Sequence, residues 1–338
     1  MGNIGVEILT INSLLIGYAP GKNPVSILPP ISASALSGEL VAVIGRNGIG
    51  KSTLLRTISR LQPSLGGTVL IDGENVHALS RLQIAQKIGY ISTEIIKIGH
   101  MRVYDLVALG RFPYTNWIGR IENVDHVIIK EAIKKTGLAH FENRFVSELS
   151  DGERQRTMIA RVLAQDTDIM IMDEPTAFLD ISGKCEIINL MRQLTAGGKT
   201  IIFSTHDFNI AINQADKIWL IQENNLTEGA PEDLLLGGAF DHLFDQAVVG
   251  FNPDDGSFSF RTERYGKIFI EGEGAKKHWT AKALDRAGFS ITDLKMFPYI
   301  KIQSDKNKWV LFTENSAESF RTLYDLINRL GNGRRKIT

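Results

Sequence analysis

A nine-residue stretch constrains this chain more than any other feature. Residues 45–53 read GRNGIGKST and fit the pattern G-x-x-x-x-G-K-[S/T] at every fixed position. The stretch follows the apolar run ELVAVIG, which is typical of a strand buried on both faces, and it leads into a helix-favouring segment. Glycines at such a loop let backbone N–H groups close around phosphate oxygens. We expect Lys51 to contact the β- and γ-phosphates of a nucleotide and Ser52 to bind Mg²⁺. The phosphate-binding residues are then Gly45, Asn47, Gly48, Gly50, Lys51, Ser52 and Thr53.

A second group of polar residues completes the chemistry that a phosphate loop needs. The run IMIMDEP places Asp173 and Glu174 at the end of an apolar strand, and FSTHD places His206 at the end of the next one. Ligands of open α/β sheets collect at the carboxyl ends of the strands, so these side chains belong near the loop. We expect Asp173 to hold Mg²⁺ and Glu174 to polarise the attacking water. His206 is expected to reach the γ-phosphate. For Asp173 and Glu174, the competing interpretation is that they cap the following helix.

The alternation of helix and strand signals predicts an α/β fold. Apolar runs of strand length alternate with amphipathic segments up to about residue 231, which favours a mostly parallel sheet covered by helices. The expected helices are residues 51–61, 80–87, 124–136, 152–165, 183–195 and 208–215. Beyond residue 250 the pattern changes to a small α+β domain. We therefore divide the chain into domains 1–250 and 251–338, with a boundary uncertain by about ten residues.

Composition excludes several classes of protein. A formal net charge of zero and a pI of about 7.1 argue against a broad nucleic-acid footprint. Cys185 is the single cysteine, so no intrachain disulfide can form, and its apolar surroundings predict a small buried side chain. No apolar run approaches the roughly 20 residues that span a bilayer. The N-terminus lacks a basic segment followed by an apolar run, so we expect no signal peptide and a cytoplasmic protein that reaches a membrane only through a partner.

The segment ELSDGERQR, residues 148–156, supports two interpretations. Ser150 and Glu153 have the spacing of a capping box, and Asp151 in the first turn complements the helix dipole. A helix start with exposed N–H groups is also a place to bind phosphate.

The order of GRNGIGKST, LSDGE, IMIMDE, FLD and STHD resembles the nucleotide-binding subunit of ABC transporters over about residues 6–250. The resemblance implies a P-loop NTPase core of ABC type with an inserted helical subdomain at about residues 95–165. It also implies a homodimer that sandwiches two ATP molecules in composite sites. By that resemblance Ser150 and Gly152 contact the γ-phosphate across the interface, Asp180 reaches across it, and Tyr18 stacks on adenine.

The chain departs from the pattern of this family at two places. The usual Leu-Ser-Gly-Gly-Gln is replaced by LSDGE, so Asp151 stands where a glycine is common, and we expect its side chain to point away from the nucleotide. After KIGYIS the family has a glutamine that touches Mg²⁺ and senses the transmembrane partner, whereas this chain has Thr93 and Glu94. Glu94 is our candidate metal ligand at this place. The alternative that Thr93 takes this role stays open.

The segment VYDLVALGRFPYTNWIG, residues 103–119, resembles importer ATPases for iron–siderophore, haem and cobalamin complexes. This subgroup implies transmembrane permease subunits, a substrate-binding protein that acts indirectly, and a location at the cytoplasmic face of the cell membrane. Phe112, Pro113, Tyr114 and Trp117 then belong to a surface that receives a permease helix, against the alternative of a loop packed on the helical subdomain. The competing function is a soluble cytosolic ABC-type ATPase with a regulatory or mechanical role.

The last 80 or so residues carry no chemical motif. Their closing helix presents Phe320, Leu323, Tyr324, Ile327 and Leu330 on one face, and residues 315 and 318 have the spacing of a capping box for it. The domain is either an appendage that stabilises the dimer or a site for a regulatory ligand such as the transported species.

Overall fold

The computed structural model describes residues 5–19, 23–93, 100–115, 119–241, 243, 249–252, 257–260, 263–303 and 308–332. All structural statements apply to these residues. The chain divides into two compact units, of which the first comprises residues up to 244 with 251–257 and the second comprises 245–250 with 258–338. Each unit is described by itself.

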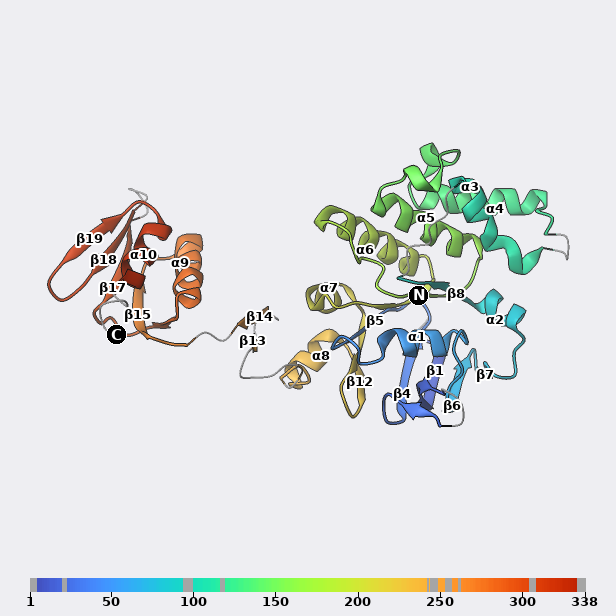
Figure 1. The fold of residues 1–338 in the computed structure, drawn as a ribbon, viewed down its shortest axis with the longest axis horizontal. Helices are drawn as coiled ribbons and strands as arrows, with labels where there is room; N and C mark the ends of the chain where they lie inside the picture. The colour runs from blue at the N-terminus through green and yellow to red at the C-terminus, as the bar shows by residue number, and fades with distance from the viewer. Residues whose placement is uncertain are drawn as a thin grey trace. The chain divides into compact units, whose positions relative to one another are not determined.

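A six-stranded sheet forms the centre of the first unit (Figure 1). Its strands pair in parallel except at one edge, where β12 runs antiparallel to β11. Every residue of β5, β9 and β10 is buried, because helices cover both faces of a parallel sheet. The mostly parallel sheet expected from the sequence is therefore confirmed. In spatial order the strands are β12 (Leu226–Gly229), β11 (Lys217–Ile221), β5 (Leu40–Gly45), β10 (Thr200–Ser204), β9 (Ile169–Met172) and β8 (Ile88–Ile91).

A four-stranded antiparallel sheet packs its apolar face into the same core. Residues of β1, β4 and β6 share one hydrophobic cluster with residues of α1 and of the central strands. A separate short hairpin joins β2 (Gly17–Tyr18) to β3 (Val25–Ser26). The four-stranded sheet has the order β4 (Ile31–Leu36), β1 (Glu7–Leu15), β6 (Gly66–Ile71) and β7 (Glu74–Asn75).

Helices of the first unit fall into two groups. One group accompanies the central sheet: α1 (Lys51–Ile58), α2 (Arg81–Lys87), α6 (Ile181–Ala196), α7 (Phe208–Gln214) and α8 (Pro231–Leu236). The other group is a helical layer in which α3, α4 and α5 contact one another, on the side of the unit away from β1 and β4 (Figure 1). This layer contains α3 (Val103–Ala108), η1 (Leu109–Tyr114), α4 (Asn123–Lys135), η2 (Ala139–Phe141), η3 (Val146–Glu148) and α5 (Asp151–Ala164).

The second unit is built on a five-stranded mixed sheet. Its core joins the sheet to both helices, with Ile268, Leu284, Ile300 and Leu326 fully buried. A two-stranded sheet of β13 (Val249–Asn252) and β14 (Ser257–Phe260) precedes it in the chain. The five strands lie in the order β16 (Phe289–Thr292), β15 (Gly266–Glu271), β17 (Tyr299–Gln303), β18 (Lys308–Phe312) and β19 (Ala317–Phe320), and the helices are α9 (Gly274–Arg286) and α10 (Leu323–Asn332).

Three expectations were wrong at the level of local structure. Phe320, expected on the closing helix, lies in β19, which pairs with β18. The capping box proposed at residues 315 and 318 does not exist, because Glu318 lies in β19 and binds Arg329 of α10 through both carboxylate oxygens. The hydroxyl of Thr322 instead accepts the N–H of Asp325, 3.1 Å away, and α10 begins directly after Thr322. Cys185, expected to be buried, is exposed because it lies on the outer face of the first turns of α6.

None of the helices in the described part of the chain is long and apolar enough to cross a membrane.

Candidate nucleotide site

The phosphate loop, residues 45–53, leaves β5 and enters α1 through glycines that no other residue could replace without strain. Gly45 has φ 156° and Gly50 has φ 112°. A Cβ atom on Gly45 would lie 2.6 Å from the backbone oxygen of Ile221, and one on Gly50 would lie 3.0 Å from the Cγ2 atom of Ile27. No side chain caps the start of α1, so its first N–H groups remain turned toward the loop.

Lys51 lies at the bottom of this loop and is only 7% exposed. Its Nζ atom donates to the carbonyl oxygens of Gly45 at 2.9 Å and Arg46 at 3.3 Å. Burial lowers the pKa of the Lys51 ammonium group, and the negative charges of Glu174 and Asp173 partly offset that effect. The cation is therefore already held at the place where phosphate charge would arrive.

Asp173 joins the phosphate loop to the neighbouring strands. Its side chain is 2% exposed, and its Oδ1 atom accepts hydrogen bonds from the hydroxyls of Ser52 at 2.9 Å and Ser204 at 2.7 Å. The Ser52 hydroxyl and the Asp173 carboxylate meet beside the phosphate loop, and oxygen ligands of this kind suit Mg²⁺. The structure thus brings together Ser52 and Asp173, two of the three expected metal ligands. Glu94, the third, lies outside the described residues.

Glu174 has an unusual backbone conformation. Its φ is 48°, in the left-handed region, which costs a non-glycine residue on the order of 1–3 kcal/mol. Its Oε2 atom lies 3.4 Å from Nδ1 of His206, and the side chains are 27% and 56% exposed. Glu174 and His206 face the same cavity as Lys51. Such strain is typical of sites where a side chain must point in one direction.

The cavity above the loop has a volume of about 660 Å³. Tyr18 stands at its wall, half exposed, and its hydroxyl lies 3.1 Å from the Oγ1 atom of Thr53. That contact ties the ring of Tyr18 to α1 and leaves it beside the loop, where an adenine could stack. The expected residues that line this cavity are Tyr18, Asn47, Gly48, Gly50, Lys51, Ser52, Thr53, Glu174 and His206.

The signature loop, residues 149–153, contributes to a separate cavity of about 440 Å³. Ser150, Gly152 and Asp180 line it together, so within one chain they are not part of the phosphate-loop cavity. The capping box is confirmed: the Ser150 N–H donates to Glu153 at 2.8 Å, and the Glu153 N–H donates to Ser150 at 3.3 Å. Asp180 caps α6 by accepting the N–H of Gly183 at 2.7 Å.

Asp151 has a local partner that sequence reasoning missed. Its Oδ1 atom lies 2.7 Å from the NH1 atom of Arg154, one turn later on α5. The same guanidinium donates from NH2 to the carbonyl of Leu149 at 2.9 Å. The carboxylate that replaces a small residue in this loop is therefore neutralised within the helix. The i, i+3 spacing of opposite charges was the available signal.

Thr93 and Ser204 also belong to the site. The Oγ1 atom of Thr93 donates to the backbone carbonyl of Asp173 at 2.9 Å, and the Oγ atom of Ser204 accepts the N–H of Glu174 at 2.9 Å. Ser204 was not among the expected residues. Its position two residues before His206 is the only sequence signal that pointed to it.

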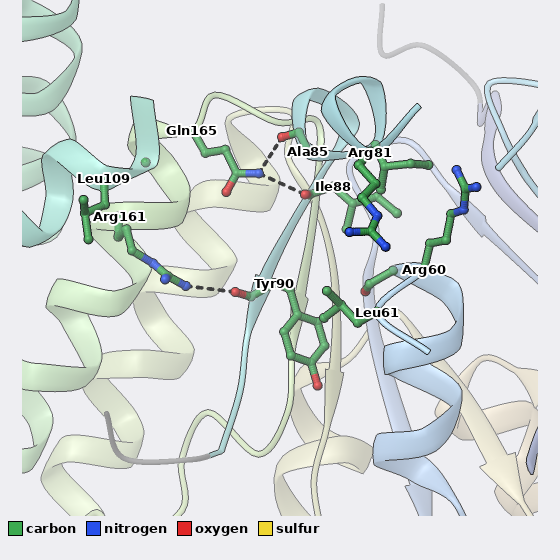
Figure 2. A pocket seen from close by; sticks show the side chains of 12 residues that line it. Arg60, Leu61, Arg81, Ala85, Ile88, Tyr90, Leu109, Arg161 and Gln165 are labelled. Atoms are coloured by element: carbon green, nitrogen blue, oxygen red, sulfur yellow. Dashed lines mark hydrogen bonds between the residues drawn. The ribbon is translucent and has the colours of Figure 1, made fainter. Parts of the chain in front are cut away.

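A third cavity, of about 460 Å³, lies between the central sheet and the helical layer (Figure 2). Arg60, Arg81 and Arg161 line it, and its described lining contains no acidic residue. Arg161 donates to the carbonyl of Tyr90 at 3.1 Å, and burial lowers the pKa of its guanidinium. Leu61 and Leu109 at the cavity are 61% and 49% exposed. We call this feature the arginine cavity.

Next to the arginine cavity, a buried ion pair fixes the segment that carries Phe112. Arg111 donates from Nε to Asp125 of α4 at 2.8 Å and from NH1 to the carbonyl of Ala164 of α5 at 3.0 Å. Its guanidinium also lies over the ring of Tyr114, 4.1 Å from the centroid. Phe112 itself is 72% exposed. The expected loop is thus a 3₁₀ turn that holds an aromatic ring outward, and Trp117 lies outside the described residues.

Two family models match this chain. The ABC transporter model matches residues 28–177, which include the phosphate loop, the signature loop and Asp173. The model described as the iron ABC transporter C-terminal domain matches residues 265–331, in the second unit.

Individual relatives agree with these matches. The achromobactin transport ATP-binding protein CbrD of Dickeya dadantii is 36% identical over 229 residues, which are 67% of this chain and 84% of that protein. The cobalamin import ATP-binding protein BtuD of Halobacterium salinarum is 35% identical over 276 residues, 79% of this chain and 69% of that protein. Among solved structures, the dimeric ABC transporter cassette MJ0796 superposes with a TM-score of 0.58 at 27% identity, covering 66% of this chain and 98% of that cassette.

Proposed function

This chain belongs to the ATP-binding proteins of ABC transporters, and on that premise we propose that it is the ATPase subunit of an importer for iron chelates or cobalamin-type complexes. The match of residues 265–331 to an iron transporter domain supports the iron class, and the relatives named for achromobactin and cobalamin support the wider class. The observation that carries the enzymatic part is the meeting of Lys51, Asp173 and Glu174 at one phosphate loop.

In the proposed site, the phosphate loop and Lys51 hold the β- and γ-phosphates of ATP, and Tyr18 stacks on the adenine. Ser52 and Asp173 hold Mg²⁺, which supplies Lewis-acid stabilisation of charge on the transferred phosphoryl group. The hydroxyl of Ser52 already bonds to Oδ1 of Asp173, which supports their acting on one ion.

Glu174 is the proposed general base that orients and polarises the attacking water. His206 lies within 3.4 Å of it and is placed to contact the γ-phosphate. Glu174 and His206 face the cavity from the ends of adjacent strands. A water between them and the phosphate would therefore contact both side chains on the same side.

We further propose that two copies complete each other's sites. Ser150 and Gly152 of one copy would contact the γ-phosphate bound to the other, and Asp180 would cross the interface. Their exposed cavity, apart from the phosphate loop of the same chain, supports this arrangement, as does the dimer of the MJ0796 cassette. The capped start of α5 leaves backbone N–H groups available to an anion that arrives from outside.

The arginine cavity and Phe112 are the proposed docking face for a transmembrane permease. A partner loop with apolar side chains and at least one carboxylate would complement the exposed Leu61 and Leu109 and the three arginines. This contact would place the chain at the cytoplasmic face of the cell membrane, with a substrate-binding protein engaged only through the permease.

The domain boundaries are part of the proposal. We assign residues 1–250 to the ATP-binding domain, about 95–165 to its helical subdomain, and 251–338 to an accessory domain. The accessory domain has its own buried core, which supports an independent role in dimer stability or in binding a regulatory ligand.

Copurification tests the importer proposal directly. The tagged full-length chain is expressed in its native membranes, solubilised gently and analysed for bound proteins, with Arg81→Glu and Phe112→Lys as docking variants. We expect a polytopic permease to copurify with the unaltered chain and to be lost from both variants, while ATP binding persists. ATPase activity without any membrane partner would instead favour a soluble regulatory or mechanical ATPase.

A further inference from the structure

The peptide group that joins Asp173 to Glu174 is held on both sides by hydroxyl groups. Its carbonyl oxygen accepts from Thr93 Oγ1 at 2.9 Å, and its N–H donates to Ser204 Oγ at 2.9 Å. Thr93 follows β8 and Ser204 ends β10, the two strands on either side of β9. Both polar atoms of this one peptide are therefore fixed by side chains where the chain leaves the sheet.

This peptide decides where the carboxylate of Glu174 points. One residue earlier, the N–H of Asp173 still donates to Ile91 in the sheet at 2.8 Å. At Glu174 the backbone turns into the left-handed region, with φ 48°. A non-glycine residue keeps that conformation only when its surroundings hold it. Rotation of the peptide would swing the Glu174 side chain away from His206, 3.4 Å from it.

Ser204 couples this support to the acidic group beside Ser52. The Ser204 hydroxyl accepts the N–H of Glu174 and donates its own proton to Oδ1 of Asp173 at 2.7 Å. Ser204 is fully buried, so no water competes for either bond. Thr93 is only half-buried, and its hydroxyl donates to the Asp173 carbonyl. Thr93 is therefore the part of the support that can be removed without breaking a hydrogen bond to the Asp173 carboxylate, which accepts from Ser52 and Ser204.

We propose that Thr93 and Ser204 are positioning residues that clamp the Asp173–Glu174 peptide and so aim Glu174 at the attacking water. The proposal rests on the function proposed above, in which Glu174 is the general base. It gives Thr93 a role different from the metal contact that the family resemblance implies at this position. The hydroxyl of Thr93 donates its proton to the backbone carbonyl of Asp173, directly before Glu174.

Three variants of the full-length chain separate this role from others. Thr93→Val keeps the size and branching of the side chain but removes the hydroxyl, and Thr93→Ser keeps the hydroxyl. Thr227→Val in edge strand β12, also half-buried, is the matched control for the loss of a threonine hydroxyl from this sheet. The measurements are kcat, KM for MgATP, the Mg²⁺ concentration for half-maximal rate, and ATP binding under non-turnover conditions.

For Thr93→Val we expect kcat to fall about tenfold, a fraction of the 10²–10⁴ that a positioned base contributes. KM, Mg²⁺ dependence and ATP binding should stay within about twofold, and Thr93→Ser should restore kcat, because only the aim of Glu174 has changed. A shift in Mg²⁺ dependence with kcat retained would overturn the proposal in favour of a metal contact. A Thr93→Ser enzyme as slow as Thr93→Val would make the role one of packing.

A double-mutant cycle with Glu174→Gln distinguishes this inference from the proposed function. If Thr93 acts through Glu174, Thr93→Val should change the residual rate of the Glu174→Gln enzyme by less than about twofold. If Thr93→Val lowered the rate equally in the unaltered chain and in Glu174→Gln, the positioning role of Thr93 would be wrong, and Glu174 could still be the base. Full activity of Glu174→Gln alone would sink the proposed function itself. If Thr93→Val fails to fold, Thr93→Ala is carried through the same cycle.

Discussion

The phosphate loop and the signature loop are built in opposite ways. The phosphate loop and the acidic residue that it contacts are drawn into the core, where Lys51 is 7% and Asp173 is 2% exposed. The signature loop stays at the surface, with the side chain of Asp151 58% exposed. Its hydrogen bonds are local to the first turns of α5. The packing of the chain therefore shapes the phosphate-loop half of the proposed site. The signature-loop half lies on the surface and is held by local contacts alone.

The glycines of the phosphate loop and of the signature loop differ in the same way. A Cβ on Gly45 would meet a backbone oxygen at 2.6 Å, whereas a Cβ on Gly152 meets nothing within 4 Å in this chain. Gly45 is thus required by the fold around it. The packing within this chain places no such requirement on Gly152. This difference is consistent with the proposal that a second copy completes the half of the site that contains Gly152.

The largest expected effect is on the buried half. Glu174→Gln should lower the turnover of ATP about 1,000-fold, because the proposed base is lost while the shape of the side chain is kept. ATP binding should persist, since Lys51 and the loop are untouched. Steady-state hydrolysis and equilibrium binding of a fluorescent ATP analogue measure the two quantities.

Persistent dimers in ATP would be the companion observation for Glu174→Gln, because bound nucleotide would no longer be cleared. Loss of ATP binding together with activity would show that Glu174 supports the cavity itself, and the distinction between the two halves would then weaken.

The second effect concerns the support of α5, which carries the signature loop. Asp125→Asn should lower the free energy of unfolding by about 3 kcal/mol, because it leaves Arg111 buried without its charge partner. Chemical denaturation at neutral pH measures this value. Asp72→Asn, at an exposed ion pair with Lys87, is the control and should cost less than about 1 kcal/mol.

The effect of Asp125→Asn should depend on pH with a definite sign. Burial alone would raise the pKa of the Asp125 carboxyl, but hydrogen bonds from the Glu122 N–H and from Arg111, with the charge of Arg111, lower it below its ordinary value of 3.8. The stabilisation is therefore fully present above 3.8 and is lost as the pH falls through the lower folded-state pKa. If the free energies of unfolding of the unaltered chain and of Asp125→Asn were already equal at pH 5 to 6, this assignment would be contradicted.

A smaller effect separates the glycines of the two loops. Gly152→Ala should stabilise α5 by up to about 1 kcal/mol, since alanine favours helix, yet weaken ATP-driven dimerisation about tenfold by displacing the phosphate from the N–H groups. Gly45→Ala should instead destabilise the fold by about 2 kcal/mol through strain and overlap. Thermal unfolding and analytical ultracentrifugation with ATP measure both.

The comparison of the two loops would break if Gly152→Ala dimerised normally in ATP. Phosphate from the second copy would then not contact this helix start, and the exposed cavity of Ser150 and Asp180 would need another occupant.

The smallest expected effect is at Asp151. Its charge is already paired with Arg154, so Asp151→Asn should tighten ATP-driven dimerisation by less than tenfold, or about 1.4 kcal/mol. Titration of the dimer with ATP gives the affinity. Arg154→Gln is the informative counterpart, because it exposes the Asp151 charge and should weaken the dimer more than Asp151→Asn strengthens it.

Local patterns carried most of the predictions that the structure confirmed. Helices expected at residues 124–136 and 152–165 begin and end within one residue of α4 and α5. The Ser150–Glu153 capping box is present because it depends on four consecutive residues. Failures came where distant contacts decided the outcome. Phe320 fits the apolar face of the closing helix, yet it lies in β19 because that strand pairs with β18.

The sequence alone determined the parallel-sheet fold, the phosphate loop and the identity of the acidic pair, because strand burial and loop chemistry are written in short runs of adjacent residues. Only the tertiary structure decided that Thr93 and Ser204 hold one peptide between them, since they stand more than a hundred residues apart in the chain. It also decided that Asp151 is paired and Cys185 is exposed. The physical reason is that a hydroxyl or carboxylate acquires its role from the partner within hydrogen-bond reach, and strand order sets that partner.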